Sequence, residues 1–347
     1  QITCSRLLHD GEPIVDLHTI SMCWRGPPEP IVLRCCAADI LKLKARQMRD
    51  EPLVYLNGEI LELEDARISP FDRGFMWGDG VYEVTPCFNG EPYRLRDHME
   101  RLYRSLRYVR IDPGLDLETM LAETLRLLEA NADRFAAGPQ YRLGHWVTRG
   151  GSPFTVASDV EGPATVFIFL GSADTSATAQ NHETGVRLSV STTRRNPPEC
   201  IETRAKVTSK MNQLLAELDA GVRGALPLML DLDGNVAENS VANFFMARDG
   251  VLWTAPERNI LEGVTRKVVF ELCTRLSIPL EERLFTMYDV AQADEMFITS
   301  SGICAMPVSA VDDFVPKQPV PGPITTQLID AFTADTGFDF RQLANAE

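Results

Sequence analysis

Apolar residues follow two periodicities in the first part of the chain, and each predicts one kind of element. Short alternating runs predict strands on both sides of Asn57-Gly58, at residues 80–85 and beyond Asn89-Gly90. An Asn-Gly pair between two such runs favours a tight hairpin turn. Apolar residues at three- and four-residue spacing predict helices over 96–110 and 115–130. The pattern therefore indicates hairpins mixed with amphipathic helices.

Two further strands and a linker are expected before the middle of the chain. Residues 141–147 and 164–170 read as strands, and the continuous apolar run of the second indicates burial on both faces. Residues 171–183 are small and polar. Such composition is typical of a connection between domains, so we place a linker at residues 174–183.

Several strands and helices are expected in the second half of the chain. These are a strand at 186–192, a three-stranded meander with two Asp-Gly turns at 226–254, a helix from 263, a strand at 294–299 and a helix at 325–333. Another helix is expected just after Lys206, capped by Thr208 or Ser209. Its apolar residues share one face, which we expect to be buried: Met211, Leu214, Leu215 and Leu218.

These elements predict an α/β (α+β) chain with two domains. The smaller domain would cover residues 49–173, and the larger one, with a meander or barrel-like core, residues 184–347. Residues 1–48 have weak periodicity, with one short helix expected at 37–48. We read them as an extension and assign them no function.

Composition, charge and the absence of certain motifs argue against several functional classes. The chain has 347 residues and a net charge of −15, which argues against a nucleic-acid partner. No run of about 18 apolar residues is present, so we expect no membrane span, and no signal-peptide pattern is seen. The eight cysteines form no C-x-x-C pair and the five histidines no metal-binding spacing. We therefore expect a cytoplasmic protein with a small-molecule substrate and no metal.

Four places in the second half carry candidate chemistry, each with a simpler alternative. Lys206 precedes a helix start, where lost solvent would lower its pKa toward that of a nucleophilic amine, or it is an ordinary solvated lysine. Glu238 lies between small residues and could be only an exposed edge charge. The helix start after Gly263 can bind an anion or be a plain cap. The Ser300-Ser301-Gly302 turn suits a phosphate nest or is simply a turn.

Taken in order, the motifs resemble those of fold-type IV pyridoxal-phosphate enzymes, the class IV aminotransferases. FMWGDGVYEV and HMERLYRS look like the branched-chain and D-amino-acid types. PPECIETRAK, LEGVTRKVV and GPITTQLIDAF are similar to the (R)-amine transaminase branch. The resemblance runs from about Val54 to Phe332. It implies a two-domain fold, a homodimer and ping-pong transfer of an amino group from an amino acid to a 2-keto acid.

The resemblance also implies roles for individual residues. Lys206 would hold pyridoxal 5′-phosphate as a Schiff base and move the substrate proton. Glu238 would face the pyridine nitrogen and Tyr82 would line the substrate pocket. The remaining implied residues would bind the phosphate: Arg101, Val264, Thr265, Ser300 and Ser301. Lys210 competes with Lys206 but lies off the family spacing.

One departure from the family pattern concerns the substrate. D-amino-acid enzymes trap the substrate carboxylate with an arginine and a histidine, whereas this chain has Phe154 and Val156 at those places. Arg149 is a nearby cation that could replace them or be only a loop residue. We expect small or branched apolar substrates. The alternatives are a D-amino-acid or (R)-amine transaminase, a lyase of the aminodeoxychorismate type, and a non-catalytic binding protein.

Overall fold

The computed structural model describes residues 8–9, 12–13, 51–134, 140–151, 162–172 and 175–341. The chain divides into two units, residues 1–46 and 47–347. In the first unit, β1 (Leu8–His9) pairs antiparallel with β2 (Glu12–Pro13). The helix expected at 37–48 lies outside the described residues. Everything below concerns the second unit.

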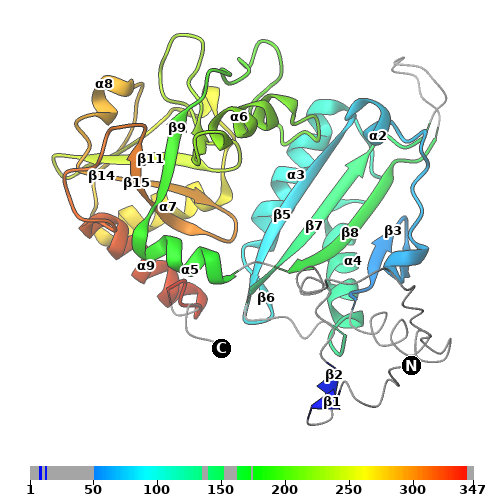
Figure 1. Ribbon diagram of the computed structural model, residues 1–347. Helices are drawn as coiled ribbons and strands as arrows, with labels where there is room; N and C mark the ends of the chain where they lie inside the picture. The colour runs from blue at the N-terminus through cyan, green and yellow to red at the C-terminus, as the bar shows by residue number, and fades with distance from the viewer. Residues whose placement is uncertain are drawn as a thin grey trace, which may run out of the picture. The chain divides into compact units, whose positions relative to one another are not determined.

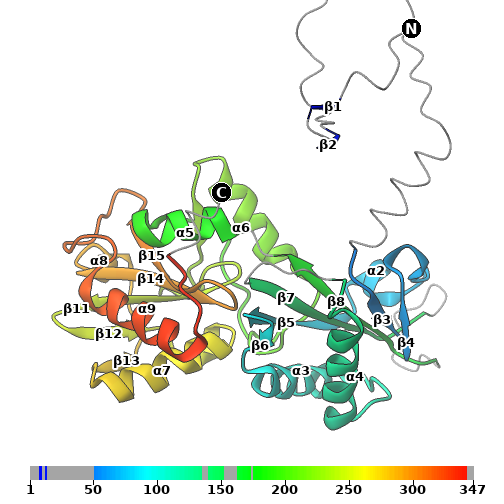
Figure 2. The ribbon, with the colours of Figure 1, turned by 90° about the horizontal axis from the view of Figure 1, so that it is seen from below.

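The first sheet of the second unit has six antiparallel strands in the order β4-β3-β8-β7-β5-β6. They are β3 (Val54–Leu56), β4 (Glu59–Leu61), β5 (Gly80–Phe88), β6 (Glu91–Pro92), β7 (Gln140–Thr148) and β8 (Thr165–Ser172). The associated helices are η2 (Leu63–Asp65), α2 (Arg73–Trp77), α3 (Leu95–Val109) and α4 (Leu117–Ala130). Helices α3 and α4 lie together on one side of this sheet (Figures 1 and 2).

Local turn chemistry explains the two hairpins of this sheet. Asn57 and Gly58 have φ angles of 52° and 101°, and Asn89 and Gly90 have 51° and 89°. These left-handed conformations suit Asn and Gly and match the twist of paired strands. The apolar face of α3 then packs on β5, where Met99 and Leu102 are fully buried. The predicted hairpins and both helices are confirmed.

The expectation that β8 is buried on both faces is wrong. Its residues alternate between buried and half-buried, with Phe167 and Phe169 on the half-buried face. The two rings stack at 5.2 Å, and Phe169 also lies 5.2 Å from Trp146 of β7. The continuous apolar run reflects an aromatic surface on the sheet face away from α3 and α4, and not a second covered face.

The second sheet has seven strands in the order β10-β9-β15-β14-β11-β12-β13. They are β9 (Val186–Val190), β10 (Leu226–Leu228), β11 (Asn243–Arg248), β12 (Val251–Thr254), β13 (Leu280–Glu282), β14 (Glu295–Ser300) and β15 (Cys304–Val311). The helices are α5 (Thr175–Thr184), α6 (Met211–Gly221), η3 (Glu257–Asn259), α7 (Val264–Leu276), α8 (Met287–Val290) and α9 (Pro323–Thr336). Helices α7 and α9 share a buried core with β11 and β14.

The expected meander is present only in part. β10 pairs in parallel with β9 instead of with β11. Bridges at Leu230–Val236 and Glu238–Asn243 nevertheless connect the segment after β10 back to β11. The sheet therefore curls toward a barrel, and Glu238 lies in one of these irregular bridges rather than in a regular middle strand.

Helix α6 differs from its prediction at both its start and its apolar face. Lys210 occupies the N-cap position without a side-chain cap, and Thr208 Oγ1 instead donates to the Gly78 carbonyl at 2.8 Å. The four residues expected to be buried are exposed: Met211 (64%), Leu214 (52%), Leu215 (47%) and Leu218 (70%). The helix buries Ala216 and Ala220 against β10 instead.

The segment expected as a linker forms helix α5. His182 is fully buried there, and its ring nitrogens lie 2.9 Å from the carbonyls of Thr178 and Ile303. The segment is therefore docked on β15 and is not an extended connection. The two sheets do lie on either side of it in the chain, but the proposed domain boundaries stay a prediction.

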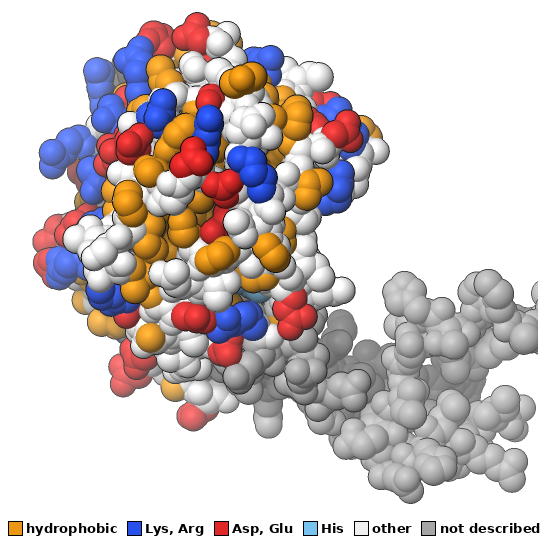
Figure 3. Space-filling model, turned by 90° about the vertical axis from the view of Figure 1, so that its left-hand side faces the viewer, with side chains coloured by type: hydrophobic (Ala, Val, Ile, Leu, Met, Phe, Trp, Pro, Cys, Tyr) orange, Lys and Arg blue, Asp and Glu red, His pale blue; other side chains and the backbone are white. Residues whose placement is uncertain are grey.

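Neither a membrane-spanning helix nor a group of metal ligands is found among the described residues. None of the described helices combines the length and apolar character that a membrane span requires. Within the described residues, His, Cys, Asp and Glu side chains do not gather into a group that could hold a metal ion. On the face shown in Figure 3, acidic and basic side chains are interspersed among hydrophobic ones.

Candidate functional site

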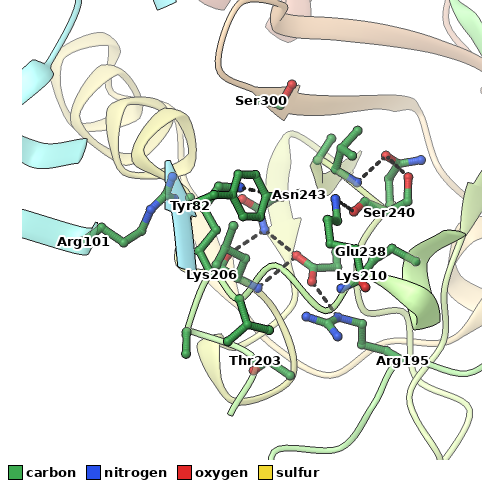
Figure 4. A pocket seen from close by; sticks show the side chains of 18 of the residues that line it. Tyr82, Arg101, Arg195, Thr203, Lys206, Lys210, Glu238, Ser240, Asn243 and Ser300 are labelled. Atoms are coloured by element: carbon green, nitrogen blue, oxygen red, sulfur yellow. Dashed lines mark hydrogen bonds and ion pairs between the residues drawn. The ribbon is translucent and has the colours of Figure 1, made fainter. Parts of the chain in front are cut away.

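Most of the residues singled out by the sequence line one pocket between the two sheets (Figure 4). They are Tyr82, Arg101, Lys206, Glu238, Val264, Thr265, Ser300 and Ser301. The first two come from β5 and α3, and the others come from the second sheet, its connections and α7.

Lys206 is fixed by the first sheet although it belongs to the segment leading into α6. Its carbonyl accepts from Tyr82 N at 3.0 Å, and its own N–H donates to Ser105 Oγ at 3.0 Å. Val207 bridges Val81, and Thr208 N donates to the Gly80 carbonyl at 2.9 Å. The segment therefore acts as a short extra strand on the free edge of β5. This pairing aims the lysine side chain into the pocket.

The Lys206 ammonium group is poorly stabilised in the pocket. Its Nζ lies 3.4 Å from Tyr82 Oη and 4.4 Å from the centroid of that ring. Burial lowers the pKa of Lys206 to about 8, and the positive charge of Arg101 adds to this, while Glu83 and Glu238 act in the opposite direction. A pKa near neutrality supplies free amine, which is the nucleophilic form.

Glu238 is a buried carboxylate with both oxygens held in place. Arg195 Nε donates to Oε1 at 2.8 Å, and Asn243 Nδ2 and Leu261 N donate to Oε2 at 3.1 and 3.0 Å. A carboxylate held in this way can accept a further proton donor from a ligand in the pocket. The sequence alone does not single out Arg195 or Asn243. Their signals were weak, a basic pair before Asn196 and an asparagine five residues after Glu238.

The start of α7 forms one polar wall of the pocket. Gly263 is its N-cap residue and no side chain caps the helix, so the first backbone N–H groups face the pocket beside Val264 and Thr265. A Cβ at position 263 would overlap the Asn243 amide oxygen, which explains the glycine. The uncapped N-terminus of this 13-residue helix is suited to bind an anion.

The turn between β14 and β15 adds hydroxyl groups to the same wall. Ser300 and Ser301 line the pocket, and Gly302 turns the chain with a φ of 99°. Thr299 also lines it, and its buried Oγ1 has no hydrogen-bond partner among the described residues. An orphaned buried hydroxyl beside an uncapped helix start indicates a missing polar ligand.

Arg101 is held by a buried ion pair that the sequence did not indicate. Its Nε and Nη2 donate to Glu83 at 2.8 and 2.7 Å, and Nη1 donates to the Glu262 carbonyl at 2.8 Å. Glu83 is fully buried and lies 3.1 Å from His98 Nδ1. The charges of Arg101 and His98 hold the Glu83 pKa well below its usual value despite burial, which raises it. These bonds use only part of the guanidinium's donor capacity.

Arg149 has other partners in the structure, and its expected place in the substrate pocket stays a prediction. Its Nε and Nη2 pair with Asp79 at 2.8 and 3.0 Å, and it also donates to the carbonyls of Val109 and Arg110. It is not among the pocket-lining residues. Its role is to tie the start of β5 to the end of α3. Phe154 and Val156 lie outside the described residues.

Lys210 lines the pocket as well. The sequence suggested a position inside the helix, but the residue is the N-cap of α6. Its Nζ lies 3.4 Å from the Ser240 carbonyl and 5.8 Å from the Tyr82 ring centroid. The pocket thus holds two lysine side chains whose amino groups approach the ring of Tyr82.

Comparison with known proteins agrees with this site. The family model "amino-transferase class IV" matches residues 80–311. A putative branched-chain-amino-acid aminotransferase of Methanocaldococcus jannaschii is 33% identical over 80% of this chain and 94% of that protein. A D-alanine aminotransferase of Listeria innocua is 30% identical over 81% and 95%. The structure of a branched-chain aminotransferase of Thermoproteus uzoniensis with norvaline has a TM-score of 0.74 and 29% identity, covering 84% of this chain and 96% of that one.

The pocket fits the cofactor of that family, pyridoxal 5′-phosphate. It offers an amine of lowered pKa at Lys206, a fixed carboxylate at Glu238, and an anion site at the α7 start with an orphaned hydroxyl at Thr299. These are the groups needed for the aldehyde, the ring nitrogen and the phosphate. A similar branched-chain aminotransferase structure, with a TM-score of 0.75, contains pyridoxamine 5′-phosphate. The chain belongs to the class IV aminotransferases, and it is a pyridoxal-phosphate-dependent transaminase.

Proposed function

We propose that this transaminase acts on small or branched apolar amino acids and 2-keto acids, in two half-reactions of a ping-pong cycle. The observation that carries the proposal is that apolar side chains line part of the pocket that holds Lys206 and Glu238. Those side chains are Tyr82, Ile201, Val207, Val241, Leu261 and Val264. Their apolar character favours hydrocarbon side chains, and two names among the related proteins specify branched-chain aminotransferases.

In this proposal Lys206 does the chemistry. Its ε-amino group binds the cofactor covalently and later carries the proton that leaves the substrate Cα. The bound cofactor supplies an electron-poor ring that accepts the electrons of the broken Cα–H bond. The lowered pKa of Lys206 supports both roles, because an amine with a pKa of about 8 both gives and takes a proton near neutral pH.

Glu238 holds a proton on the pyridine nitrogen, and Arg195 and Asn243 orient it for this task. Both carboxylate oxygens are already bonded, so the side chain cannot turn away when the ligand arrives. A protonated ring nitrogen increases the electron demand of the ring. Glu238 is 5% exposed, and water therefore competes little for the contact.

The phosphate binds at the start of α7, with Arg101 as a further donor. Val264 and Thr265 contribute backbone N–H groups, and the Thr265 hydroxyl and the turn at Ser300 and Ser301 complete the cup. This arrangement is supported by the uncapped helix end and by the orphaned hydroxyl of neighbouring Thr299.

A substrate panel tests the preference. The purified enzyme receives single L- or D-amino acids, or (R)-1-phenylethylamine, with 2-oxoglutarate or pyruvate, and the keto product is followed. L-Leucine and L-valine should lead in kcat/KM. D-Alanine, which the name of the Listeria relative favours, is the second candidate, and a tenfold lead of D-alanine would overturn the proposed preference. Pyruvate released without an acceptor would instead indicate a lyase.

A homodimer is the second part of the proposal, and it accounts for the exposed apolar side chains. Helix α6 exposes Leu214 and Leu218, and α2 exposes Phe75 (77%) and Trp77 (48%). The two helices adjoin, because Thr208 before α6 bonds the Gly78 carbonyl at the end of α2. Large exposed apolar patches are rare on monomers. A second copy of the chain is the occupant that the family resemblance implies.

We also propose a reducing, cytoplasmic location. The four described cysteines support it, because each is a free thiol: Cys87, Cys200, Cys273 and Cys304. The enzyme is unfolded without a reducing agent, alkylated and analysed by intact-mass measurement. We expect every cysteine thiol to react.

A further inference from the structure

The pocket contains one cationic side chain more than cofactor chemistry requires. Lys210 lies four residues after Lys206, and both ammonium groups approach the ring of Tyr82, at 5.8 and 4.4 Å from its centroid. Figure 4 shows the two side chains entering the pocket from the same connecting segment. Covalent attachment uses one lysine, so the second needs a separate explanation.

Lys210 has no carboxylate partner among the described residues. Its recorded side-chain bond is to the Ser240 carbonyl at 3.4 Å, which is long for a charged donor. Glu238, a buried acid of the same pocket, is already bonded to Arg195, Asn243 and a backbone N–H. The Lys210 charge is therefore left largely unmatched inside a half-enclosed site.

The stability of α6 does not explain a lysine at this position. Lys210 is the N-cap of an 11-residue helix and makes no capping hydrogen bond. The helix dipole places partial positive charge at this end, so a cation there is disfavoured. Serine, threonine, aspartate or asparagine would stabilise the helix start better. The position of Lys210 thus points to a ligand.

The two arginines of the pocket each have a carboxylate partner. Arg101 is paired with Glu83, and Arg195 is paired with Glu238. Arg149, the alternative cation from the sequence, is bound to Asp79 outside the pocket. An amino acid and its keto acid both carry a carboxylate that must lose water on entering the pocket. A buried carboxylate requires a cation or several donors.

We propose that the Lys210 ammonium group binds the carboxylate of the amino-acid and 2-keto-acid substrates. The inference rests on the proposed preference for amino acids and names the residue that recognises their anionic end. Lys210 is then a specificity residue that favours amino acids over amines with the same hydrocarbon chain. Ser240 keeps the ammonium group oriented through its carbonyl until the substrate arrives.

Binding of an unreactive carboxylate tests the proposal directly. 4-Methylvaleric acid has the leucine side chain and a carboxylate but no amino group, and 4-methylvaleramide is its neutral counterpart. Their dissociation constants are measured by calorimetry on the cofactor-loaded parent, Lys210→Met, Lys210→Arg and the control Lys317→Met. Lys317 lies at the surface, paired with Asp294.

Lys210→Met should weaken binding of 4-methylvalerate by about ten- to a hundredfold, the usual worth of a charged hydrogen bond. Lys210→Arg and Lys317→Met should stay within a few-fold of the parent, and the amide should bind all four proteins alike. Equal affinity of parent and Lys210→Met for the acid overturns the inference, as does loss of the cofactor from Lys210→Met, measured by its absorbance.

Failure of the proposed substrate class is distinguishable from failure of this inference. If the parent binds neither 4-methylvalerate nor L-leucine, the apolar amino-acid preference is wrong and the Lys210 role falls with it. If the parent binds both and the charge at position 210 makes no difference, only the Lys210 role is wrong. A second readout is kcat/KM for L-leucine relative to 3-methylbutylamine, which should fall in Lys210→Met.

Discussion

Replacing Arg101 with methionine should have two separable effects, because the residue faces a buried acid and the proposed phosphate. Glu83 and Arg101 are 0% and 3% exposed, so solvent hardly screens their pair. Removing one partner of such a pair leaves an uncompensated charge and costs about 3–5 kcal/mol of stability. That is a large share of a typical free energy of unfolding of about 5–15 kcal/mol.

The second effect concerns cofactor affinity. Loss of one charged hydrogen-bond donor to phosphate costs about 1.5–3 kcal/mol, or roughly ten- to 150-fold in the dissociation constant. The double variant Glu83→Gln with Arg101→Met removes both buried charges and should recover most of the stability. It should not recover the affinity, because the phosphate contact is still missing.

The assay combines denaturant unfolding with titration of the apoenzyme. Pyridoxal 5′-phosphate and pyridoxal, which lacks the phosphate, are titrated into the parent, the single variant and the double variant. Pyridoxal should bind the parent and the double variant alike, whereas pyridoxal 5′-phosphate should bind the double variant more weakly. Unchanged affinity for the phosphorylated form would remove Arg101 from the phosphate cup, and unchanged stability of Arg101→Met would refute the account of the Glu83 pair.

The remaining predictions concern Glu238, Lys206 and the proposed homodimer. Glu238→Gln should slow the single-turnover half-reaction by about a hundredfold or more, and a rate near that of the parent would refute the ring-nitrogen role. The apoenzyme should capture the cofactor faster as pH rises through about 8, where Lys206 loses its proton, and a midpoint above about 10 would indicate a solvated lysine. Leu214→Glu with Leu218→Glu should give monomers in sedimentation experiments, whereas Tyr288→Glu on α8 should not, and a monomeric parent would contradict the dimer.

Local chemistry explains which elements the sequence could predict. The Asn57-Gly58 turn depends on backbone conformations that those two residues favour, so its hairpin needs no distant contact to be predicted. The helix starting after Gly263 was predictable for the same reason, since a glycine and an apolar period define it locally. Short motifs point to the residues proposed to bind the cofactor, and these residues line one pocket.

Contacts between distant elements explain what the sequence could not predict. The apolar period of α6 predicts a helix with one apolar face, but it does not say what covers that face, and Leu218 is 70% exposed. Glu83 was not singled out, because its pairing with Arg101 arises only when α3 packs on β5. Sequence proximity favours a place for Arg149 near the substrate, but it cannot reveal the bond to Asp79, 70 residues earlier in the chain.

The central claim is that Lys206 is the lysine that binds the cofactor, although Lys210 lines the same pocket. Borohydride makes a lysine–cofactor bond irreversible, and peptide mapping by mass spectrometry then identifies the modified residue. Lys206 has the lowered pKa of a nucleophile and is fixed by β5, so the pyridoxyl group should be found on Lys206, and Lys206→Ala should carry none. A pyridoxyl group on Lys210 in the parent enzyme would contradict both the assignment of Lys206 and the carboxylate role of Lys210.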